Sequence, residues 1–452
     1  MVSPSSSNVF HRLLQQEYAM FVRGRGSHLF DSTGKMYIDA AGGGAGVTCI
    51  GHAHKYVIDK INQQHLELSY IYNQAYTNPQ QERLASRLAD IAPGDLHRVY
   101  FAQDGTEANE AALRVARQYH MDRGDSQRDV VISQAFSYYG STFGAMALSG
   151  LPSARFPVNG WLPQFERVVA ARCGNAAGVL AAEPCVSDDV GNFDSIANRV
   201  GPDRIAAVVT EIVVTAAGAF NQPDDYLANL ADWCRRIGAL LIVDEIVTGL
   251  GRTGRWFCSE RAGIIPDLIT LGKSLGGGYA PISAVLVSDR IYDTIASTSG
   301  HFAHGHTLSG NPVSCAVGNA ILDVIIDEGL VERSRIVGDR IRDALSRELA
   351  TCELVSDIRG DGMFIGLEFR YVNHQFIEFE RRFASLLQRE CLNEGLLVAS
   401  GAVHPSGVVG DYLMLWPAFN ISELDIEQMI ERLKTAILRA SSAVVGASLA
   451  TT

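Results

Sequence analysis

Two stretches of the chain decide its fold, Ala239-Leu-Leu-Ile-Val-Asp-Glu245 and Pro266-Asp-Leu-Ile-Thr-Leu-Gly-Lys-Ser-Leu-Gly-Gly-Gly-Tyr279. Each contains a short apolar run that is typical of a strand buried on both faces of a parallel sheet. Asp244 and Lys273 lie at or just past the ends of these two predicted strands. Because the carboxyl ends of parallel strands open on a common crevice, we expect the two side chains to face each other there.

A lysine that faces an aspartate in a desolvated crevice suits one kind of chemistry. The amine can form a Schiff base, and the carboxylate can keep a pyridine nitrogen protonated, as pyridoxal phosphate requires. A solvated loop lysine and a turn-capping aspartate are the simpler alternative, and this pair of residues alone does not decide between them.

The size and charge of the chain restrict the classes of protein to consider. Its 452 residues suit two domains, or one large domain with a smaller appendage, and its 47% of hydrophobic residues is ordinary for a soluble α/β enzyme. The net charge of −12 argues against a nucleic acid or an anionic membrane as partner. The eight cysteines show no CxxC spacing, and the polar N-terminus does not resemble a signal peptide, so we expect a cytoplasmic protein with free thiols.

The middle of the chain alternates short apolar runs with amphipathic stretches, which is the pattern of repeated βα units. The predicted strands are Arg98–Ala102, Asp129–Gln134, Ile205–Glu211, Ala239–Glu245, Asp267–Gly272 and Ile282–Val287. Helices are expected between several of them, for example over Asp224–Ile237, where apolar residues recur at helical spacing.

The two ends of the chain differ from this middle. Hairpin-like segments are expected around Gly34 and around Gly42-Gly43-Gly44. Further elements are predicted as helices over Asn311–Ile326, Leu330–Cys352, Phe376–Glu394 and Leu424–Leu438, and as extended chain over Glu353–Phe369. We therefore expect a large domain over residues 71–325, a smaller domain built from residues 1–70 and 326–440, and a disordered tail over residues 441–452.

A candidate phosphate cradle follows the first predicted strand of the middle section, in Gln103-Asp-Gly-Thr-Glu-Ala-Asn-Glu110. Gly105 would let the backbone approach a ligand closely, Thr106 offers a hydroxyl, and the free amides of a helix N-terminus attract an anion. The same residues fit a simple helix cap, with Asp104 and Glu107 in a capping-box pattern. Likewise, Tyr138 could stack on a flat ring, although an aromatic residue is more often part of the core.

Taken together, these motifs resemble the class III, or ω-amino-acid, aminotransferases among the fold-type I pyridoxal-phosphate enzymes. The resemblance covers nearly the whole chain and rests on Gly51-His52, Gly105–Glu110, Tyr138-Tyr-Gly140, Asp244–Gly254, Leu271–Gly278, His304–Pro312 and Ile358–Gly362. It implies an α/β fold, with a large domain whose mostly parallel central sheet is flanked by helices and a smaller α+β domain formed from both termini.

The resemblance also implies roles for single residues. Lys273 would be the Schiff-base lysine and Asp244 the partner of the pyridine nitrogen, and both would be catalytic as well as cofactor-binding. Gly105 and Thr106 match the phosphate-binding turn of the family. The cofactor would therefore be pyridoxal 5′-phosphate, held between the predicted helix and the two predicted strands.

Four further cofactor-binding positions follow from the same resemblance. Tyr138 would stack on the ring, Ile246 would pack on its opposite face, and Glu211 would lie near the substrate side. Thr307 would reach the phosphate of the neighbouring subunit, which implies a homodimer with shared active sites.

The chain departs from the family pattern at several positions. Tyr139 stands where many members have histidine, Val247 where some have glutamine, and Ile212 where proline is common. The segment Leu413–Glu423 lacks the arginine with which several members bind a substrate carboxylate. An amine or an unusual amino acid therefore remains open as the donor, and Tyr70 is, with Tyr72, a candidate pocket residue.

Two other motifs suggest different chemistry and are weaker. Gly249-Leu-Gly-Arg-Thr-Gly254 fits the G-x-G-x-x-G fingerprint of dinucleotide sites, but it does not directly follow its strand, and Ser274 stands where an acidic residue is expected. His301, His304 and His306 could suggest a metal site, but no carboxylate or cysteine accompanies them, and we predict no bound metal.

We therefore expect an aminotransferase that moves an amino group from an amine or an (ω-)amino acid to a 2-oxo acid such as pyruvate or 2-oxoglutarate. Another pyridoxal-phosphate reaction on the same scaffold, performed by a decarboxylase, epimerase or lyase, is the alternative. A nicotinamide-dependent oxidoreductase would leave Lys273 unexplained, and a non-catalytic binding protein would leave both Lys273 and Asp244 unexplained.

Overall fold

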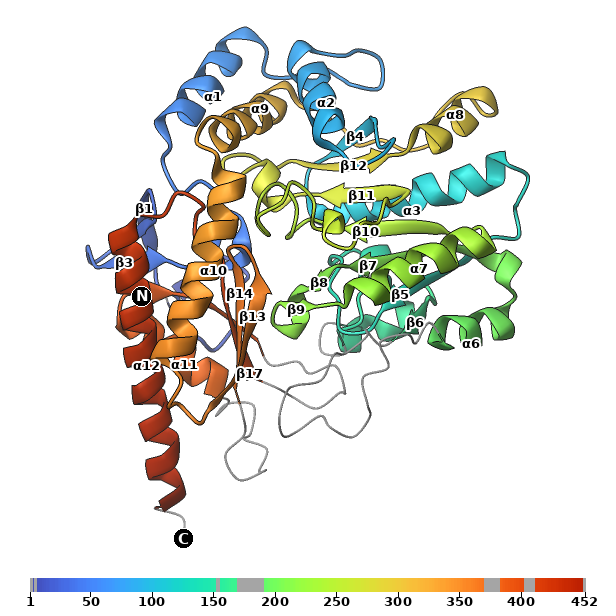
Figure 1. Ribbon diagram of the computed structural model, residues 1–452. Coiled ribbons are helices and arrows are strands. Elements are labelled where there is room, and N and C mark those ends of the chain that lie inside the picture. Colours follow the sequence, from blue (N-terminus) through green and yellow to red (C-terminus); the bar gives the residue numbers. More distant parts are fainter. Residues whose placement is uncertain are drawn as a thin grey trace.

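The computed structural model describes residues 3, 6–151, 155–168, 191–369, 383–401 and 411–449. In these residues the chain forms a large domain around a seven-stranded sheet and a smaller domain beside it (Figure 1). The predicted helix Phe376–Glu394 lies partly outside the described residues, and helix α11 is seen over Phe383–Asn393.

The large sheet has the strand order β4-β12-β11-β10-β7-β5-β6. The bounds of its strands are β4 Arg98–Ala102, β5 Val130–Gln134, β6 Glu166–Val168, β7 Ile205–Glu211, β10 Leu240–Asp244, β11 Leu268–Leu271 and β12 Ser283–Val287. β12 runs antiparallel to both of its neighbours, whereas the other pairings are parallel. The mostly parallel sheet is thus confirmed, and the strands predicted from the sequence are present, with the short edge strand β6 as an addition.

Helices cover both faces of this sheet and bury the side chains of its central strands. In β10, Ile242 packs in the cluster that includes α3 (Gly105–Asp122), and the next residue, Val243, packs in the cluster that includes α7 (Asp224–Ile237). Because successive side chains of a strand point to opposite faces, a strand covered on both sides must be apolar throughout. This explains why the central strands appear in the sequence as unbroken apolar runs.

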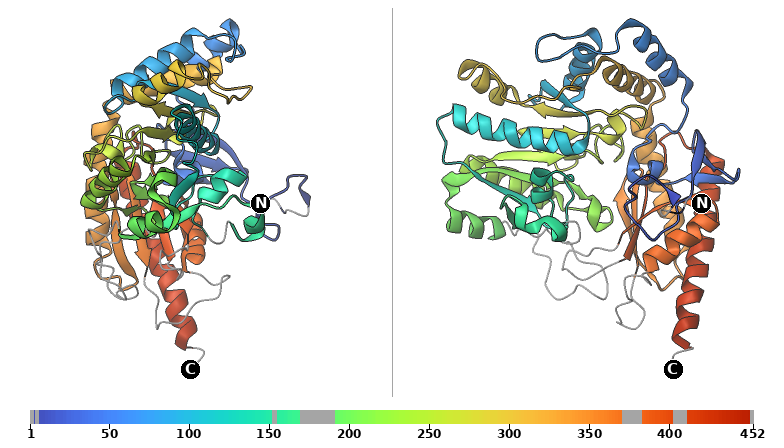
Figure 2. Two further views of the ribbon diagram at one scale, coloured as in Figure 1. Left: turned by 90° about the vertical axis from the view of Figure 1, so that its right-hand side faces the viewer. Right: turned by 180° about the vertical axis from the view of Figure 1, so that it is seen from behind.

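The smaller domain is built from both ends of the chain. Strand β15 pairs in parallel with β3, so that Leu396 lies opposite Ile38. The strands of its two sheets are β1 Phe21–Arg25, β2 His28–Asp31, β3 Met36–Asp39 and β15 Leu396–Leu397 in one, and β13 Val355–Asp361, β14 Phe364–Phe369, β17 Asp411–Leu415 and β16 Ala399–Gly401 in the other. Figure 2 shows the C-terminal helix beside these N-terminal strands in the view from behind.

Two of the remaining long helices, α9 Pro312–Asp327 and α10 Leu330–Glu348, match the sequence prediction closely. Helix α12 Glu423–Leu449 begins as predicted and extends further, whereas α1 Lys55–Glu67, α2 Pro79–Ile91 and α8 Asp289–Ser297 were not predicted individually. Helix α9 begins at Pro312, after Asn311, whose side chain accepts hydrogen bonds from the first-turn backbone. In the described residues, none of the helices combines the length and the apolar character that a membrane crossing requires.

The segment around Gly42-Gly43-Gly44 does not form the hairpin that the sequence predicts. It forms a tight turn over Gly42–Gly46, in which Gly43 and Gly44 have φ angles of 73° and 95°. The Asp39 carboxylate causes this local fold, because it accepts hydrogen bonds from the backbone N–H groups of Ala41 and Gly43. The chain then continues into α1 without returning as a strand. The hairpin expected around Gly34 is present as β2 and β3.

The disordered tail expected over residues 441–452 is corrected for residues 441–449, and residues 450–452 lie outside the described residues. Helix α12 continues without a break to Leu449. The residues Ser441–Leu449 contain no proline, so no backbone N–H is missing there and the helix does not have to stop where the amphipathic pattern weakens. A run of small side chains is therefore not a sufficient sign of an unfolded end.

Candidate active site

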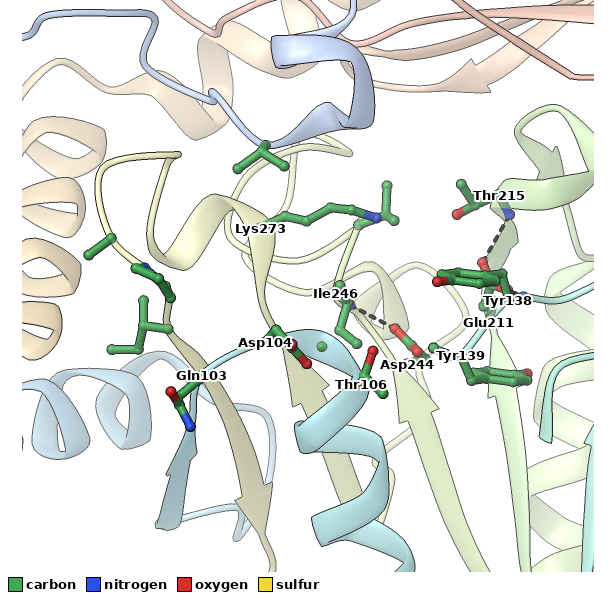
Figure 3. A pocket seen from close by; sticks show the side chains of 17 residues that line it. Gln103, Asp104, Thr106, Tyr138, Tyr139, Glu211, Thr215, Asp244, Ile246 and Lys273 are labelled. Atoms are coloured by element: carbon green, nitrogen blue, oxygen red, sulfur yellow. Dashed lines mark hydrogen bonds between the residues drawn. The ribbon is translucent and has the colours of Figure 1, made fainter. Parts of the chain in front are cut away.

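A cavity of about 320 Å³ lies at the carboxyl ends of β7, β10 and β11, where the predicted crevice was placed. Strand ends, the first turn of α3 and Val47 from the N-terminal part of the chain surround it (Figure 3). The predicted residues that line it are Gly105, Thr106, Tyr138, Glu211, Asp244, Ile246 and Lys273. Thr307 is exposed outside this cavity, and its predicted role depends on a second subunit.

Lys273 borders the cavity from a strained position of the backbone. Its φ of 38° lies in the left-handed region, which a residue with a side chain occupies at a cost of roughly 1–3 kcal/mol. The residue follows β11 and Gly272 and begins a short 3₁₀ turn, Lys273–Leu275. Its amine points into the cavity (Figure 3). Burial lowers the pKa of Lys273, and the carboxylates of Asp244 and Glu211 partly offset this, so the amine is closer to its neutral, nucleophilic form.

Asp244 ends β10, and its carboxylate is held in one orientation. Asn109 Nδ2 donates to one oxygen at 2.8 Å, and the backbone N–H of Ile246 donates to the other at 2.9 Å. Burial raises the pKa of Asp244 to about 6, while these hydrogen bonds and Lys273 lower it. A cationic ring nitrogen next to this carboxylate would favour its ionised form further.

Asn109 is the functional residue that the sequence analysis missed. Its side chain also donates to the carbonyl of Tyr139 at 2.9 Å and accepts from the Thr270 hydroxyl at 3.1 Å, so it links α3 with the ends of two strands. The signal was present in the sequence, since Asn109 comes four residues after Gly105 and therefore lies on the same helix face. It is a positioning residue for the Asp244 carboxylate.

The first turn of α3 is capped as predicted, and its geometry is compatible with a phosphate group, whose binding stays a prediction. The Asp104 side chain accepts from the backbone N–H of Glu107 at 2.9 Å, and the Glu107 carboxylate accepts from the backbone N–H of Gln103 at 3.0 Å. A Cβ atom on Gly105 would lie 2.7 Å from the Ile246 side chain. Glycine therefore keeps this cradle open, and the helix N-terminus can hold an anion beside the Thr106 hydroxyl.

Gly140 packs against Thr106, so a substitution at Gly140 tests the proposed phosphate cradle. Its φ is 137°, and an added Cβ atom would lie 2.6 Å from the Thr106 hydroxyl. We expect Gly140→Ala to displace Thr106 and to weaken binding of pyridoxal phosphate at least about tenfold, as measured by titration with the cofactor. Gly160→Ala is the matched control, because an added Cβ atom meets nothing within 4 Å there. Equal cofactor affinity of the two variants would contradict the cradle.

Tyr138 and its neighbour Tyr139 play different parts. The Tyr138 ring borders the cavity with 46% of its surface exposed, and its hydroxyl lies 2.8 Å from Ser141 Oγ. Tyr139 is buried and donates from its hydroxyl to the carbonyl of Val209 at 3.2 Å. A ring that stacks on a flat cofactor must present an open face, which Tyr138 does. Tyr139 also lines the cavity but is almost fully buried, so it presents no open ring face.

Glu211 ends β7 and is buried, with only 4% of its surface exposed. Its two oxygens accept from the backbone N–H groups of Tyr138, at 3.2 Å, and Thr215, at 2.9 Å. Burial is the main cause that raises the pKa of Glu211 to about 7, and the negative charge of the Asp244 carboxylate is the second. Two buried acids thus face one lysine at the same end of the sheet.

This raised pKa has a consequence for stability. A carboxyl group whose pKa is higher in the folded than in the unfolded chain stabilises the fold below its unfolded value, and that contribution is lost as the pH rises through the folded value. Relative to Glu211→Gln, which cannot ionise, the cofactor-free wild type should lose about 1–3 kcal/mol of unfolding free energy between pH 5 and pH 8. Urea unfolding of both proteins at several pH values measures this difference. A difference that does not change with pH would show that Glu211 titrates normally.

The weaker motifs do not form the sites that they suggested. The segment 249–254 packs against α10 and the β13–β14 turn instead of opening a helix at the cavity. Among the described residues, no group of three side chains is arranged to hold a metal ion; the rings of His304 and His306 lie edge to face with centroids 4.8 Å apart. Tyr70 and Tyr72 are partly exposed and do not line the cavity.

The chain matches known proteins along nearly its whole length. The sequence model of the family "Aminotransferase class-III" matches residues 11–437. An uncharacterized aminotransferase of Bacillus subtilis is 32% identical to this chain, over 94% of this chain and 96% of the relative. The crystal structure of an (S)-enantioselective omega-transaminase from Thermomicrobium roseum is 29% identical, with a TM-score of 0.87, and covers 96% of this chain and 95% of its own.

A second solved structure bears on the cofactor. The omega transaminase from Pseudomonas jessenii in complex with PMP is 27% identical, has a TM-score of 0.87, and covers 95% of this chain and 94% of its own. The lysine and aspartate of the cavity and the open helix N-terminus fit the same kind of cofactor. The chain therefore belongs to the class III aminotransferases, enzymes of fold type I that use pyridoxal phosphate.

Proposed function

We propose that this aminotransferase takes its amino group from an amine, or from an amino acid whose carboxylate is remote from the reacting carbon, and passes it to a 2-oxo acid such as pyruvate or 2-oxoglutarate. The observation that carries the proposal is the pair of Lys273 and Asp244 across one cavity at the head of α3. Pyridoxal phosphate, when bound, supplies an aldehyde carbon that accepts an amino group and a ring that accepts electrons.

Each residue of the cavity would have a separate role in binding the cofactor or in moving protons. The N-terminus of α3, with Gly105 and Thr106, would hold the phosphate group. The Asp244 carboxylate would keep a proton on the ring nitrogen, and the Lys273 amine would remove and return protons as general base and then as general acid. Tyr138 and Ile246 would enclose the ring and exclude water from it.

The charges around the cavity support the choice of donor. Among the described lining residues, Lys273 is the one lysine and arginine is absent, whereas Asp104, Glu211 and Asp244 are acidic. The sequence from residue 390 to residue 431 contains neither lysine nor arginine. A substrate carboxylate close to the reacting carbon would be desolvated near Glu211 without a cation of this chain beside it, which is unfavourable.

The homodimer with shared active sites is part of the proposal. In the N-terminal arm, residues 6–20, the exposed fractions are 64% for Val9, 92% for Phe10 and 60% for Leu14, and Figure 2 shows this arm projecting from the rest of the chain. Trp161 is 78% exposed as well. Uncovered apolar side chains of this kind favour contact with a second copy of the chain, which would also give the exposed Thr307 a phosphate to reach.

A cytoplasmic location is likewise a proposal. The free cysteines that are buried in the described residues are Cys49, Cys234, Cys258, Cys315 and Cys391. Burial keeps such thiols from forming disulfides, and unpaired thiols are typical of proteins from a reducing compartment. Fractionation of the native host would test this location directly.

The visible spectrum of the purified protein tests the proposed reaction. The band of the bound cofactor is recorded while amines and amino acids are added one at a time without an acceptor, and then pyruvate or 2-oxoglutarate is added. Loss of the band with an amine, and its return with stoichiometric use of the 2-oxo acid, is the expected result. Response to 2-amino acids alone would overturn the proposed donor, and a product formed without consumption of a 2-oxo acid would identify a decarboxylase, epimerase or lyase.

A further inference from the structure

Arg252, in the middle of the segment Gly249–Gly254, is a buried cation outside the cavity. Its Nη1 donates to the carbonyls of Met363, at 3.2 Å, and Pro417, at 2.6 Å, and its guanidinium carbon lies 4.5 Å from the centroid of the Phe419 ring. Within the described part of the chain, its Nε and Nη2 atoms have no hydrogen-bond partner. A buried charge held by two carbonyls and a ring is costly, so a simple packing role does not explain it.

The backbone of the same residue is fixed to the smaller domain. The Arg252 carbonyl accepts from the backbone N–H of Met363 at 3.0 Å and from the hydroxyl of Ser334, on α10, at 3.0 Å. A Cβ atom on Gly362 would lie 2.7 Å from this carbonyl, and a Cβ atom on Gly254 would lie 2.8 Å from the Cα of Arg335. The segment and the smaller domain therefore touch backbone to backbone, a closeness that only glycine permits.

The N-terminal part of the chain also contacts the segment around Phe419, whose ring lies against Arg252. The backbone N–H of Phe419 donates to the carbonyl of Cys49 at 2.7 Å, and the Asn420 side chain donates to the carbonyl of Ile50 at 3.2 Å. Arg252 thus lies where the large domain and both chain ends of the smaller domain join.

A short series of hydrogen bonds connects this junction with the floor of the cavity. The Thr253 hydroxyl donates to the carbonyl of Thr248 at 3.4 Å, and the Thr248 hydroxyl donates to the Glu245 carboxylate at 3.0 Å. That carboxylate also accepts from two backbone N–H groups, those of Cys258 and Ser259. Glu245 directly follows Asp244, so a displacement at the junction would be transmitted to the active-site aspartate.

We propose that Arg252 is a positioning residue of the active site, which fastens segment 249–254 to the smaller domain and thereby holds Asp244, Ile246 and Val247 at the cavity. The side chain itself touches neither substrate nor cofactor. The inference rests on the proposed function for what the cavity binds, and on the contacts above for how its floor is held.

Three variants separate positioning from general stability. Arg252→Met keeps the unbranched apolar stem of the side chain but removes the charge and the two hydrogen bonds, and Arg252→Lys keeps a donor and the charge. Arg333→Met is the matched control, because Arg333 on α10 donates to the carbonyls of Phe419, at 2.9 Å, and Ile421, at 2.7 Å, and pairs with Glu423. None of these partners lies in segment 249–254. The measurements are the dissociation constant of pyridoxal phosphate, the circular dichroism of its visible band, kcat, KM and the unfolding temperature.

Arg252→Met is expected to weaken cofactor binding at least about tenfold, to alter the visible circular dichroism and to lower kcat at least about tenfold, with KM changed less than about twofold. Arg252→Lys should recover most of this loss. Arg333→Met should lower the unfolding temperature but leave cofactor affinity and kcat within about twofold of wild type. If Arg252→Met behaves like Arg333→Met, Arg252 is structural only and the proposal is overturned.

Two further measurements keep the test decisive. If Arg252→Met does not fold, Ser334→Ala replaces it, because it removes the hydroxyl that donates to the Arg252 carbonyl; unchanged cofactor affinity in that variant would overturn the proposal. Hydrogen exchange of the cofactor-free proteins separates the positioning role of Arg252 from the proposed function of the cavity. Faster exchange over residues 244–250 in Arg252→Met, but not in Arg333→Met, supports the positioning role even if wild type binds no pyridoxal phosphate, in which case only the proposed function fails.

Discussion

Replacing Lys273 by alanine should lower kcat at least about 10³-fold while the chain remains folded. The amine of this residue borders the cavity, and among the described lining residues no other lysine can take over its proton transfers. Alanine also removes the nucleophile that the family joins to its cofactor. Steady-state rates at saturating pyridoxal phosphate, together with the unfolding temperature, measure both parts of this result.

Two comparisons make the Lys273 result specific. Lys273→Arg keeps a positive charge but not a nucleophilic amine, so it should be as inactive as the alanine variant. Lys55→Ala removes an exposed lysine that pairs with Asp59 on α1 and should behave as wild type. After borohydride reduction, mass spectrometry should find the cofactor on Lys273. More than a tenth of wild-type kcat in Lys273→Ala would disprove the assignment of this lysine.

Replacing Asp244 by asparagine should lower kcat roughly 10²–10⁴-fold, because a neutral amide cannot keep a proton on the ring nitrogen. The free energy of unfolding of the cofactor-free protein should change in the opposite sense. Burial raises the pKa of Asp244 to about 6, so its ionised form destabilises the fold above that pH, and asparagine removes this cost. The expected result for Asp244→Asn at pH 8 is therefore a lower kcat, measured by steady-state kinetics, together with a higher free energy of unfolding, measured with urea.

The control for this variant is Asp267→Asn. Asp267, at the opposite end of the sheet, accepts from the backbone N–H of Leu241 at 2.8 Å and forms an ion pair with Arg290. Removal of its charge should therefore reduce stability slightly and leave kcat within about twofold of wild type. If Asp244→Asn loses stability and activity together, as a damaged core residue would, the carboxylate has a structural role and the proposed partner of the ring nitrogen is wrong.

The central strands and the positions of Asp244 and Lys273 could be predicted because they follow from local rules. Apolar runs of strand length identify buried strands, and the ends of parallel strands meet at one edge. Helix α7 was predicted to the residue, since its apolar spacing and the glycine at its end agree.

What could not be predicted depends on contacts between distant segments or on side chains that capture the backbone. The turn at Gly42 exists because Asp39 binds its N–H groups, and a run of glycines alone resembles a hairpin. The role of Asn109 requires knowing that β10 ends beside the first turn of α3. Thr307 needs a second subunit, so its role stays a prediction.

The pairing of β3 with β15 sets the order in which the protein can be completed during synthesis. Ile38 leaves the ribosome early, whereas Leu396, its partner, emerges only when most of the chain has been made. Until then β3 lacks its partner β15, and Ile38 lacks the C-terminal residues of its core cluster, so this edge stays exposed to other nascent chains. The large domain can fold first, but a chain that stops short of β15 would leave the smaller domain without its core. Truncated products of this gene should therefore aggregate instead of accumulating as partly active enzyme.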